Sequence, residues 1–268
     1  FTRAIEKLEH YADEMATGKK VARPGFMDKR FDNLARAISR LRGQLDGKKY
    51  VEEYVHSLTH ELKTPITSVS AAAELLQEEL PAEQRQQFLD NIQNANRRMS
   101  RLVERMLELA RLEGQTPLQT SDEFDLGHCI HQLLEERSAL IAARRIQLDM
   151  PDSPVVIARG DPLLIQQAIA NLLDNALLYG QAGSVVSLRY GASEKRHFVE
   201  VLNRDQQLDP LVIQRAFERF FSLPPQEQKS KSNGLGLSFV LEIMKLHRGT
   251  AELSNTEQGV LAKIIWPV

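Results

Sequence analysis

The stretch "SLTHELKTP" brings together side chains that could move a phosphoryl group. His60 is followed directly by a carboxylate, Glu61, and four residues later by a hydroxyl, Thr64. An imidazole nitrogen can attack phosphorus while a neighbouring carboxylate accepts its proton, and a hydroxyl one helical turn away can position water. The zinc-protease pattern HExxH is excluded, because Thr64 occupies the place of its second histidine. Simple solvation of an exposed helical histidine is the alternative for this stretch taken alone.

A helix is predicted over residues 48–79, with apolar side chains spaced as in the heptad seam of packed helices. The seam residues are Val51, Val55, Leu58, Leu62, Ile66, Val69, Ala73 and Leu76. His60 lies two residues from both Leu58 and Leu62, about 200° around the helix, so we expect its imidazole to face water. The step from Leu62 to Ile66 repeats a four-residue spacing beside Pro65, which predicts a stutter and a bend.

A second helix is predicted over residues 83–113, after a short turn at "ELPAEQ". Its apolar seam alternates four-residue and three-residue steps without a break. The seam residues are Phe88, Ile92, Ala95, Met99, Leu102, Met106 and Leu109. Because two helices cannot bury such stripes alone, we expect a homodimeric antiparallel four-helix bundle formed through residues 48–114.

The residues before and after the two long helices have different predicted secondary structures. Beyond a linker at 115–123, helices are predicted near 126–143, 161–179 and 235–247, and strands at 146–150, 185–190, 197–202, 250–254 and 260–266. One mixed sheet covered by helices on one face, an α/β sandwich, is expected for residues 124–268. Residues 1–47 hold two amphipathic helical stretches joined by an extended connector, the outline of a signal relay, and an ordinary helical hairpin fits them equally well.

Composition excludes several classes of protein. The 268 residues include 34 basic and 36 acidic side chains, and this net charge of -2 argues against nucleic acid as a partner. One cysteine, Cys129, excludes a disulfide framework and fits a reducing compartment. The sequence contains no run of about twenty apolar residues. Because Phe1 opens the chain inside a predicted helix, we expect a piece of a longer, membrane-anchored protein.

Five motifs, in order along the chain, resemble those of sensor histidine kinases. "HELKTP" resembles the H box, "NLLDNALLY" the N box, "FERFF" the F box, "NGLGL" the second glycine box and "FDNLARAISRL" the second helix of a HAMP relay. The longer stretches "YVEEYVHSLTHELKTP" and "FERFFSLP" are most similar to CreC-type members of that family. The resemblance implies a HAMP-like relay at 1–47, a dimerisation and histidine phosphotransfer domain at 48–114, and a Bergerat-type ATP-binding domain at 124–268.

The resemblance also implies a site for ATP and Mg²⁺. Asn175 would hold Mg²⁺ through its side-chain oxygen, a hard ligand, and Asn171 would line the same helix face. Gly234 and Gly236 would present backbone amides to phosphate oxygens at the start of a helix. The other expected nucleotide-binding residues are Tyr179, Asn203, Asp205, Arg219, Phe220, Lys229, Leu235 and Leu237. The polar segment 222–232 would form a short lid over the nucleotide.

The first glycine box of the family, D-x-G-x-G, is changed in this chain. Asn203 stands where the family has an aspartate that accepts from the adenine amino group, and Asp205 and Gln207 occupy the two glycine positions. A neutral acceptor binds less strongly than a charged one, and two positions suited to φ > 0 lose glycine. Together these changes predict a loss of about 2 to 4 kcal/mol, or thirtyfold to a thousandfold weaker ATP binding.

These features predict a two-component kinase. His60 would take the γ-phosphoryl group of ATP with help from Glu61 and pass it to an aspartate of an OmpR-like cytoplasmic response regulator. Thr64 would help water remove the phosphoryl group from that aspartate. The chain would be the cytoplasmic portion of a bacterial inner-membrane protein. Alternatively, the glycine-free "NRDQQ" loop indicates a kinase-impaired protein that acts mainly as a response-regulator phosphatase or an interaction scaffold.

Overall fold

The computed structural model describes most of the chain beyond residue 47. The described residues are 48–78, 80–118, 122–150, 155–193, 195–204, 207–223 and 233–268, with Glu6, Lys7, His10, Glu14, Asn33 and Ala35. Beyond position 57 their side chains are described too, except that of His60. The chain divides into a first unit, Phe1–Arg111, and a second unit, Leu112–Val268. The predicted relay at 1–47 lies almost entirely outside the described residues.

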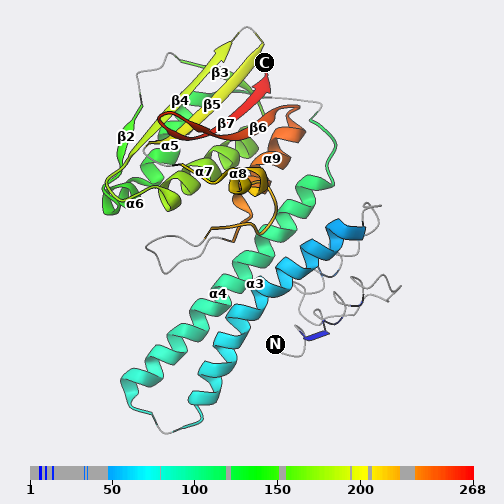
Figure 1. Cartoon of the computed structure of the whole chain (residues 1–268), viewed down its shortest axis with the longest axis vertical. Helices are drawn as coiled ribbons and strands as arrows, with labels where there is room; N and C mark the ends of the chain where they lie inside the picture. The colour runs from blue at the N-terminus through cyan, green and yellow to red at the C-terminus, as the bar shows by residue number, and fades with distance from the viewer. Residues whose placement is uncertain are drawn as a thin grey trace. The chain divides into compact units, whose positions relative to one another are not determined.

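A helical hairpin forms the described part of the first unit. The predicted long helices are confirmed as α3 (Lys48–Leu75) and α4 (Ala82–Glu113), of which α4 enters the second unit at Leu112 (Figure 1). The seam of α4 is buried as predicted at Ala95, Met99, Leu102, Met106 and Leu109. Within the ranges given above, no helix is long and apolar enough to cross a bilayer.

The seam of α3 differs from the prediction beyond Leu62. Pro65 and Ala72 are buried, whereas the predicted seam residue Ala73 is exposed. The predicted seam residues Ile66, Val69 and Leu76 are half-buried. Helix α3 continues through Pro65, and the stutter expected between Leu62 and Ile66 stays a prediction, because Pro65 is buried and Ile66 is half-buried.

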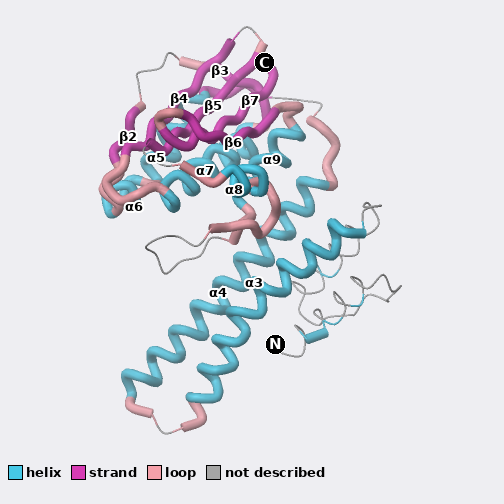
Figure 2. The backbone as a smooth tube through the Cα atoms, viewed as in Figure 1, coloured by secondary structure: helices cyan, strands magenta, loops and turns pink. Residues whose placement is uncertain are grey.

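A five-stranded mixed sheet organises the second unit. Its order is β2-β4-β5-β7-β6, with β2 parallel to β4 and the other pairs antiparallel. The strands are β2 (Gln147–Asp149), β4 (Val185–Ser193), β5 (Arg196–Arg204), β6 (Thr250–Thr256) and β7 (Gly259–Pro267). Helices α5 (Leu126–Glu136), α7 (Pro162–Tyr179) and α9 (Gly236–Leu246) cover one face (Figure 2). The predicted α/β sandwich is confirmed.

Several short elements were not predicted. Strands β1 (Asp122–Asp125) and β3 (Ile157–Gly160) form a separate antiparallel pair, and helix α8 (Pro210–Arg215) follows β5. The helix predicted over 126–143 is divided at Arg137, after which α6 (Ser138–Ala143) begins. No apolar pattern in the sequence indicated these elements, and a helix of six residues is too short to show a helical period.

Described residues at both ends of the predicted linker at 115–123 belong to the second unit. The Leu118 amide donates to the Leu246 carbonyl at 3.0 Å, and Asp122 and Glu123 already belong to β1. Leu112 is buried. The second unit therefore begins with the last turn of α4, earlier than the boundary drawn from glycine and proline content.

The core of the second unit lies between the sheet and its helices. Alternate side chains of β4, β5 and β7 point into it, as expected for a sheet covered on one face. The main buried residues are Val186, Leu188, Val199, Val201, Ile264, Trp266, Ile165, Ile169, Leu172, Phe239, Val240 and Ile243. This packing fixes α7 and α9, the two helices whose ends carry the polar residues described below.

His197 is a polar residue inside that core. Its side chain is 1 % exposed, and neither ring nitrogen has a hydrogen-bond partner. The ring centroid lies 5.4 Å from that of Trp266. Burial, together with the charge of Arg159, lowers the pKa of His197. A histidine with a lowered pKa stabilises the fold above its unfolded pKa of about 6.5, and this stability is lost as pH falls through the folded-state pKa.

We expect the free energy of unfolding to fall as pH is lowered from about 7 to about 5. His197→Phe should reduce this decline, because it removes a group that must be protonated while buried. His247, whose pKa burial also lowers, should account for part of the remaining decline. Urea unfolding followed by the fluorescence of Trp266, the single tryptophan, measures both effects. An unchanged pH dependence in His197→Phe would contradict the assignment.

Candidate functional site

Helix α7 positions the two predicted asparagines. Asp161 caps its start, accepting from the amides of Leu163 and Leu164 at 3.0 and 3.1 Å. Asn171 is only 5 % exposed, and its Nδ2 donates to the Gln167 carbonyl at 3.0 Å. Asn175 follows one turn later on the same helix face and is half-buried, as is Tyr179 at the end of α7. The helix thus presents a column of polar side chains along its buried side.

The start of α9 lies against this column. A Cβ atom added at Gly236 would lie 3.5 Å from Oδ1 of both Asn171 and Asn175. An aspartate side chain caps each of α5, α7 and α8, whereas no described side chain caps α9. The first amides of α9 are therefore suited to an anionic ligand next to the asparagines. The structure brings the N box and the second glycine box together, as predicted.

The second glycine box also contacts the F box. Gly234 has φ +63°, and a Cβ atom added to it would lie 2.7 Å from Cα of Phe220. Phe220 itself adopts φ +60°, which is rare for a residue other than glycine. Leu235 is buried and Leu237 is half-buried, so the side chain of Leu235 packs in the core and only its backbone is suited to contact a ligand.

Gly234→Ala should destabilise the second unit more than Gly236→Ala. The first change adds about 1 to 2 kcal/mol of left-handed backbone strain and overlaps the Phe220 backbone. We expect the free energy of unfolding to fall by about 2 kcal/mol or more. Gly236 has ordinary van der Waals space and a helical position that favours alanine, so its change should be below about 1 kcal/mol. Urea unfolding of both variants tests this order, and equal losses would contradict it.

Asn203 closes one corner of the site by bonding to α7. Its Nδ2 donates to the Ala176 carbonyl at 3.3 Å and so connects the end of β5 to the last turns of the helix. The sequence pattern predicts this residue to be a weaker acceptor for a base. The structure gives the amide a donor role, which an aspartate at this position could not fulfil while ionised.

The glycine-free loop after β5 is tied to the β6–β7 hairpin. Gln207 Nε2 donates to the Thr256 carbonyl at 2.7 Å. Asn255 accepts from the Leu208 amide at 3.0 Å and donates to the Leu208 carbonyl at 2.7 Å. Sequence reasoning missed Asn255, because only the sheet brings it beside the loop. Asp205 lies outside the described residues.

Asn203→Asp should lower the free energy of unfolding at neutral pH by about 1 to 3 kcal/mol, because it sets a carboxylate oxygen against the Ala176 carbonyl oxygen. Asn255→Asp is the matched control, since it removes a similar amide-to-carbonyl bond at an exposed residue where water can substitute. Its loss should be smaller. Urea unfolding at pH 7 compares the two, and a more stable Asn203→Asp protein would exclude the donor role of Asn203.

Arg219 has an ion-pair partner that the sequence did not indicate. Its guanidinium is paired with the carboxylate of Glu113 at the end of α4, and the two side chains are 12 % and 11 % exposed. In this structure Arg219 is paired with the Glu113 carboxylate, and its contact with phosphate oxygens stays a prediction. Glu113 was missed because it lies more than a hundred residues away in sequence. Lys229 and the lid residues 224–232 lie outside the described residues.

The C-terminal end of α7 also has a partner that the sequence did not indicate. Arg144 donates to the carbonyls of Leu177 and Leu178, the latter at 2.8 Å. The last turn of α7 contains no basic residue of its own. Arg144 thus supplies the positive charge that stabilises this helix end, close to Tyr179.

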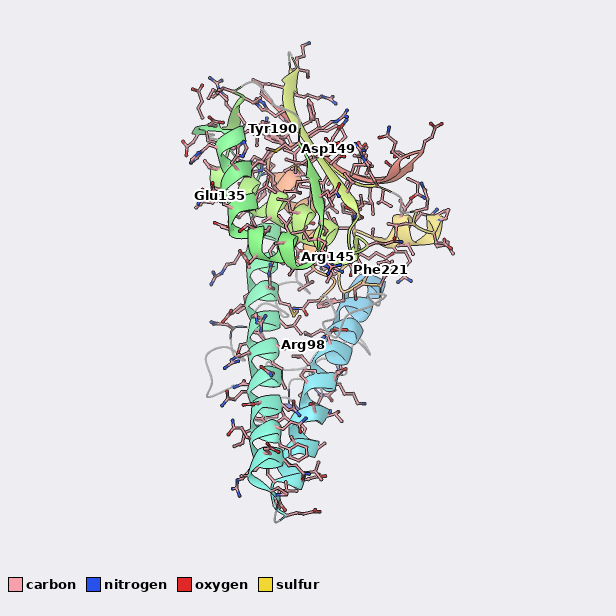
Figure 3. The ribbon with its side chains drawn as sticks, turned by 90° about the vertical axis from the view of Figure 1, so that its left-hand side faces the viewer. Arg98, Glu135, Arg145, Asp149, Tyr190 and Phe221 are labelled. Atoms are coloured by element: carbon pink, nitrogen blue, oxygen red, sulfur yellow. The ribbon has the colours of Figure 1, made fainter. Side chains whose placement is uncertain are left out.

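In the first unit, α3 carries the predicted phosphoacceptor stretch. Leu58 and Leu62 are buried as predicted, Thr64 is exposed, and the side chain of His60 is not described. Glu61, the predicted proton acceptor, is 8 % exposed, and its Oε2 lies 3.6 Å from Nη2 of Arg98. Figure 3 labels Arg98 on α4. The carboxylate therefore lies between the two helices of the hairpin. No sequence pattern indicated Arg98, because that pairing depends on how α3 and α4 align.

Two family descriptions match this chain. Residues 50–115 match the His Kinase A (phospho-acceptor) domain, and residues 160–268 match the histidine kinase-, DNA gyrase B- and HSP90-like ATPase. The sensor protein CreC of Escherichia coli (strain K12) is 36 % identical over 98 % of this chain and 55 % of its own length. The chain thus spans about half the length of the curated relatives it matches.

Solved structures share the fold. Histidine kinase ThkA in complex with the response regulator protein TrrA is similar over 97 % of this chain and 66 % of its own, with a TM-score of 0.66 and 20 % identity. Full-length ShkA in complex with AMPPNP is similar over 80 % of this chain and 45 % of its own, with a TM-score of 0.57 and 24 % identity.

Proposed function

Because this chain belongs to the sensor histidine kinase family, we propose that it transfers the γ-phosphoryl group of ATP to His60 and then to an aspartate of a response regulator. The position of Gly236 beside Asn171 and Asn175 is the observation that carries the proposal, since an added Cβ atom would lie 3.5 Å from Oδ1 of both. It joins two side-chain amides to the uncapped start of α9, an arrangement suited to a metal-bound phosphate chain.

The residues at this junction fit Mg²⁺. Asn175 would hold the ion through Oδ1, because Mg²⁺ prefers oxygen ligands. Bound Mg²⁺ would neutralise phosphate charge. Asn171 is a neutral amide tied to the Gln167 carbonyl, so it cannot act as a base that activates water. This chemistry favours transfer to histidine over hydrolysis of ATP.

The hairpin residues would serve the acceptor side of the reaction. Glu61, oriented by Arg98, is proposed to assist proton removal from His60 from within the helix interface. Thr64 is exposed on α3, where its hydroxyl can orient water for removal of phosphate from the regulator. The apolar seams of α3 and α4 support a homodimer through residues 48–114. The ThkA–TrrA complex supports a response regulator, proposed to be OmpR-like, as partner.

We propose that residues 1–47 form a HAMP-like relay and that the chain works beneath a bacterial inner membrane. The changed first glycine box is proposed to weaken ATP binding, since the Asn203 amide and the Gln207 side chain are engaged by protein carbonyls. The same contacts favour the second candidate: a kinase-impaired protein that acts mainly as a response-regulator phosphatase or scaffold.

Incubation of the purified chain with γ-labelled ATP and Mg²⁺ tests the proposed function. We expect an acid-labile, base-stable label that His60→Gln abolishes, because phosphohistidine forms only at that residue. Asn175→Ala should lower the labelling at least about tenfold, since it removes the proposed metal ligand. His131→Gln, which alters an exposed histidine on α5, is the matched control and should keep the label.

The outcomes separate the two candidates. Label that persists in His60→Gln would overturn the assignment of the acceptor. An unlabelled wild-type chain that still removes phosphate from a phosphorylated regulator would establish the phosphatase instead, and Thr64→Ala should then reduce that activity.

A further inference from the structure

The carboxylate of Glu113 is mostly buried in the second unit, beside other charged side chains. Neighbouring Leu112 is buried, and Leu118, five residues beyond Glu113, is bonded to the Leu246 carbonyl. Three charged groups surround the carboxylate: Arg219 of the F box, and Glu242 and Lys245 of α9. Lys245 is itself paired with Glu242 at 2.7 Å, so Arg219 is the direct partner of Glu113. Desolvation raises the pKa of Glu113, and Arg219 opposes this effect.

Arg219 opens a turn whose backbone is strained. The next residue, Phe220, adopts a left-handed conformation that persists only when its surroundings hold it. Arg215 holds the far side of the turn, since its guanidinium lies 4.7 Å from the centroid of the Phe221 ring and it pairs with Glu218 at 2.9 Å. At the start of the turn, the ion pair between Glu113 and Arg219 restrains the backbone that leads into Phe220.

The strained turn directly supports the proposed phosphate loop. Gly234 packs on the Phe220 backbone so closely that it has no room for a Cβ atom, and two residues later Gly236 meets the asparagines of α7. A movement of Phe220 therefore displaces Gly234 and the first amides of α9. The contacts form one chain, from Glu113 to Arg219, Phe220, Gly234 and the phosphate loop.

We propose that Glu113 is a positioning residue for nucleotide binding: by pairing with Arg219 it holds Phe220 in place and thereby sets the backbone of residues 233–236. The proposal rests on the nucleotide site proposed above and adds a residue outside it. The opposite role is chemically conceivable, with Arg219 leaving Glu113 to bind phosphate. The two roles predict opposite changes in nucleotide affinity. Loss of the Glu113 carboxylate weakens nucleotide binding if Glu113 positions the loop, and strengthens it if Arg219 leaves Glu113 to bind phosphate.

Titration of the full chain with trinitrophenyl-ATP and Mg²⁺ distinguishes the two roles. We expect Glu113→Gln to raise the Kd about tenfold, which corresponds to about 1.4 kcal/mol. Glu113→Arg combined with Arg219→Glu should recover most of the affinity, since it restores an ion pair of reversed polarity. Glu123→Gln is the matched control, because it removes an exposed glutamate–arginine pair with Arg159 elsewhere in the second unit, and its Kd should stay unchanged.

Hydrogen exchange supplies a readout that general destabilisation does not reproduce. In Glu113→Gln the backbone amides of residues 233–236 should exchange faster, while those of β4 and β5 keep wild-type protection. Unchanged or tighter nucleotide binding in Glu113→Gln, or faster exchange spread evenly over the unit, would overturn the positioning role. A wild-type chain that binds no nucleotide would instead refute the proposed function, and exchange at 233–236 would still report on Glu113.

Discussion

The close packing of the second glycine box on the F box depends on Gly234. Its missing side chain lets the loop rest on the Phe220 backbone, where a Cβ atom would lie 2.7 Å from Cα of Phe220. A larger side chain at Gly234 would force the strained F-box turn to move. Two residues later, a Cβ atom added at Gly236 would lie 3.5 Å from Oδ1 of both Asn171 and Asn175, so the start of α9 lies beside the asparagines of α7. The polar junction therefore depends on the bare backbone at Gly234 and on the core that holds both helices.

The surrounding polar groups are largely satisfied by the protein itself. Asn203 bonds to a carbonyl of α7, Gln207 bonds to the β6–β7 hairpin, and Arg144 donates to the last carbonyls of α7. The bonds of Asn203 and Arg144 replace water at partly buried backbone groups, and the bond of Gln207 is exposed. Asn203 and Gln207 thus have structural partners of their own, and Asn203 is bonded to α7, the helix that carries the proposed metal ligand.

The helical hairpin follows the same principle of burying charge only with a partner. Glu61 lies in the interface of α3 and α4 opposite Arg98, and Glu113 lies at the start of the second unit opposite Arg219. A buried carboxylate without such a partner would strongly destabilise the fold. Glu61, next to His60, is paired with Arg98 on the side of α4. Arg219, near the proposed phosphate loop, is paired with Glu113 at the end of α4.

Local patterns in the sequence determined the elements and their order. Heptad spacing predicted α3 and α4, because such a pattern depends on residues close in sequence. The resemblance of the box motifs to those of sensor histidine kinases implied that Asn171, Asn175, Gly234 and Gly236 belong to one site. Only the tertiary structure decided which partners the polar side chains have. The pairing of Arg219 with Glu113, of Glu61 with Arg98 and of Asn203 with Ala176 depends on elements far apart in the chain. Periodicity specifies which face of an element is buried, but the group it meets there is set by long-range packing.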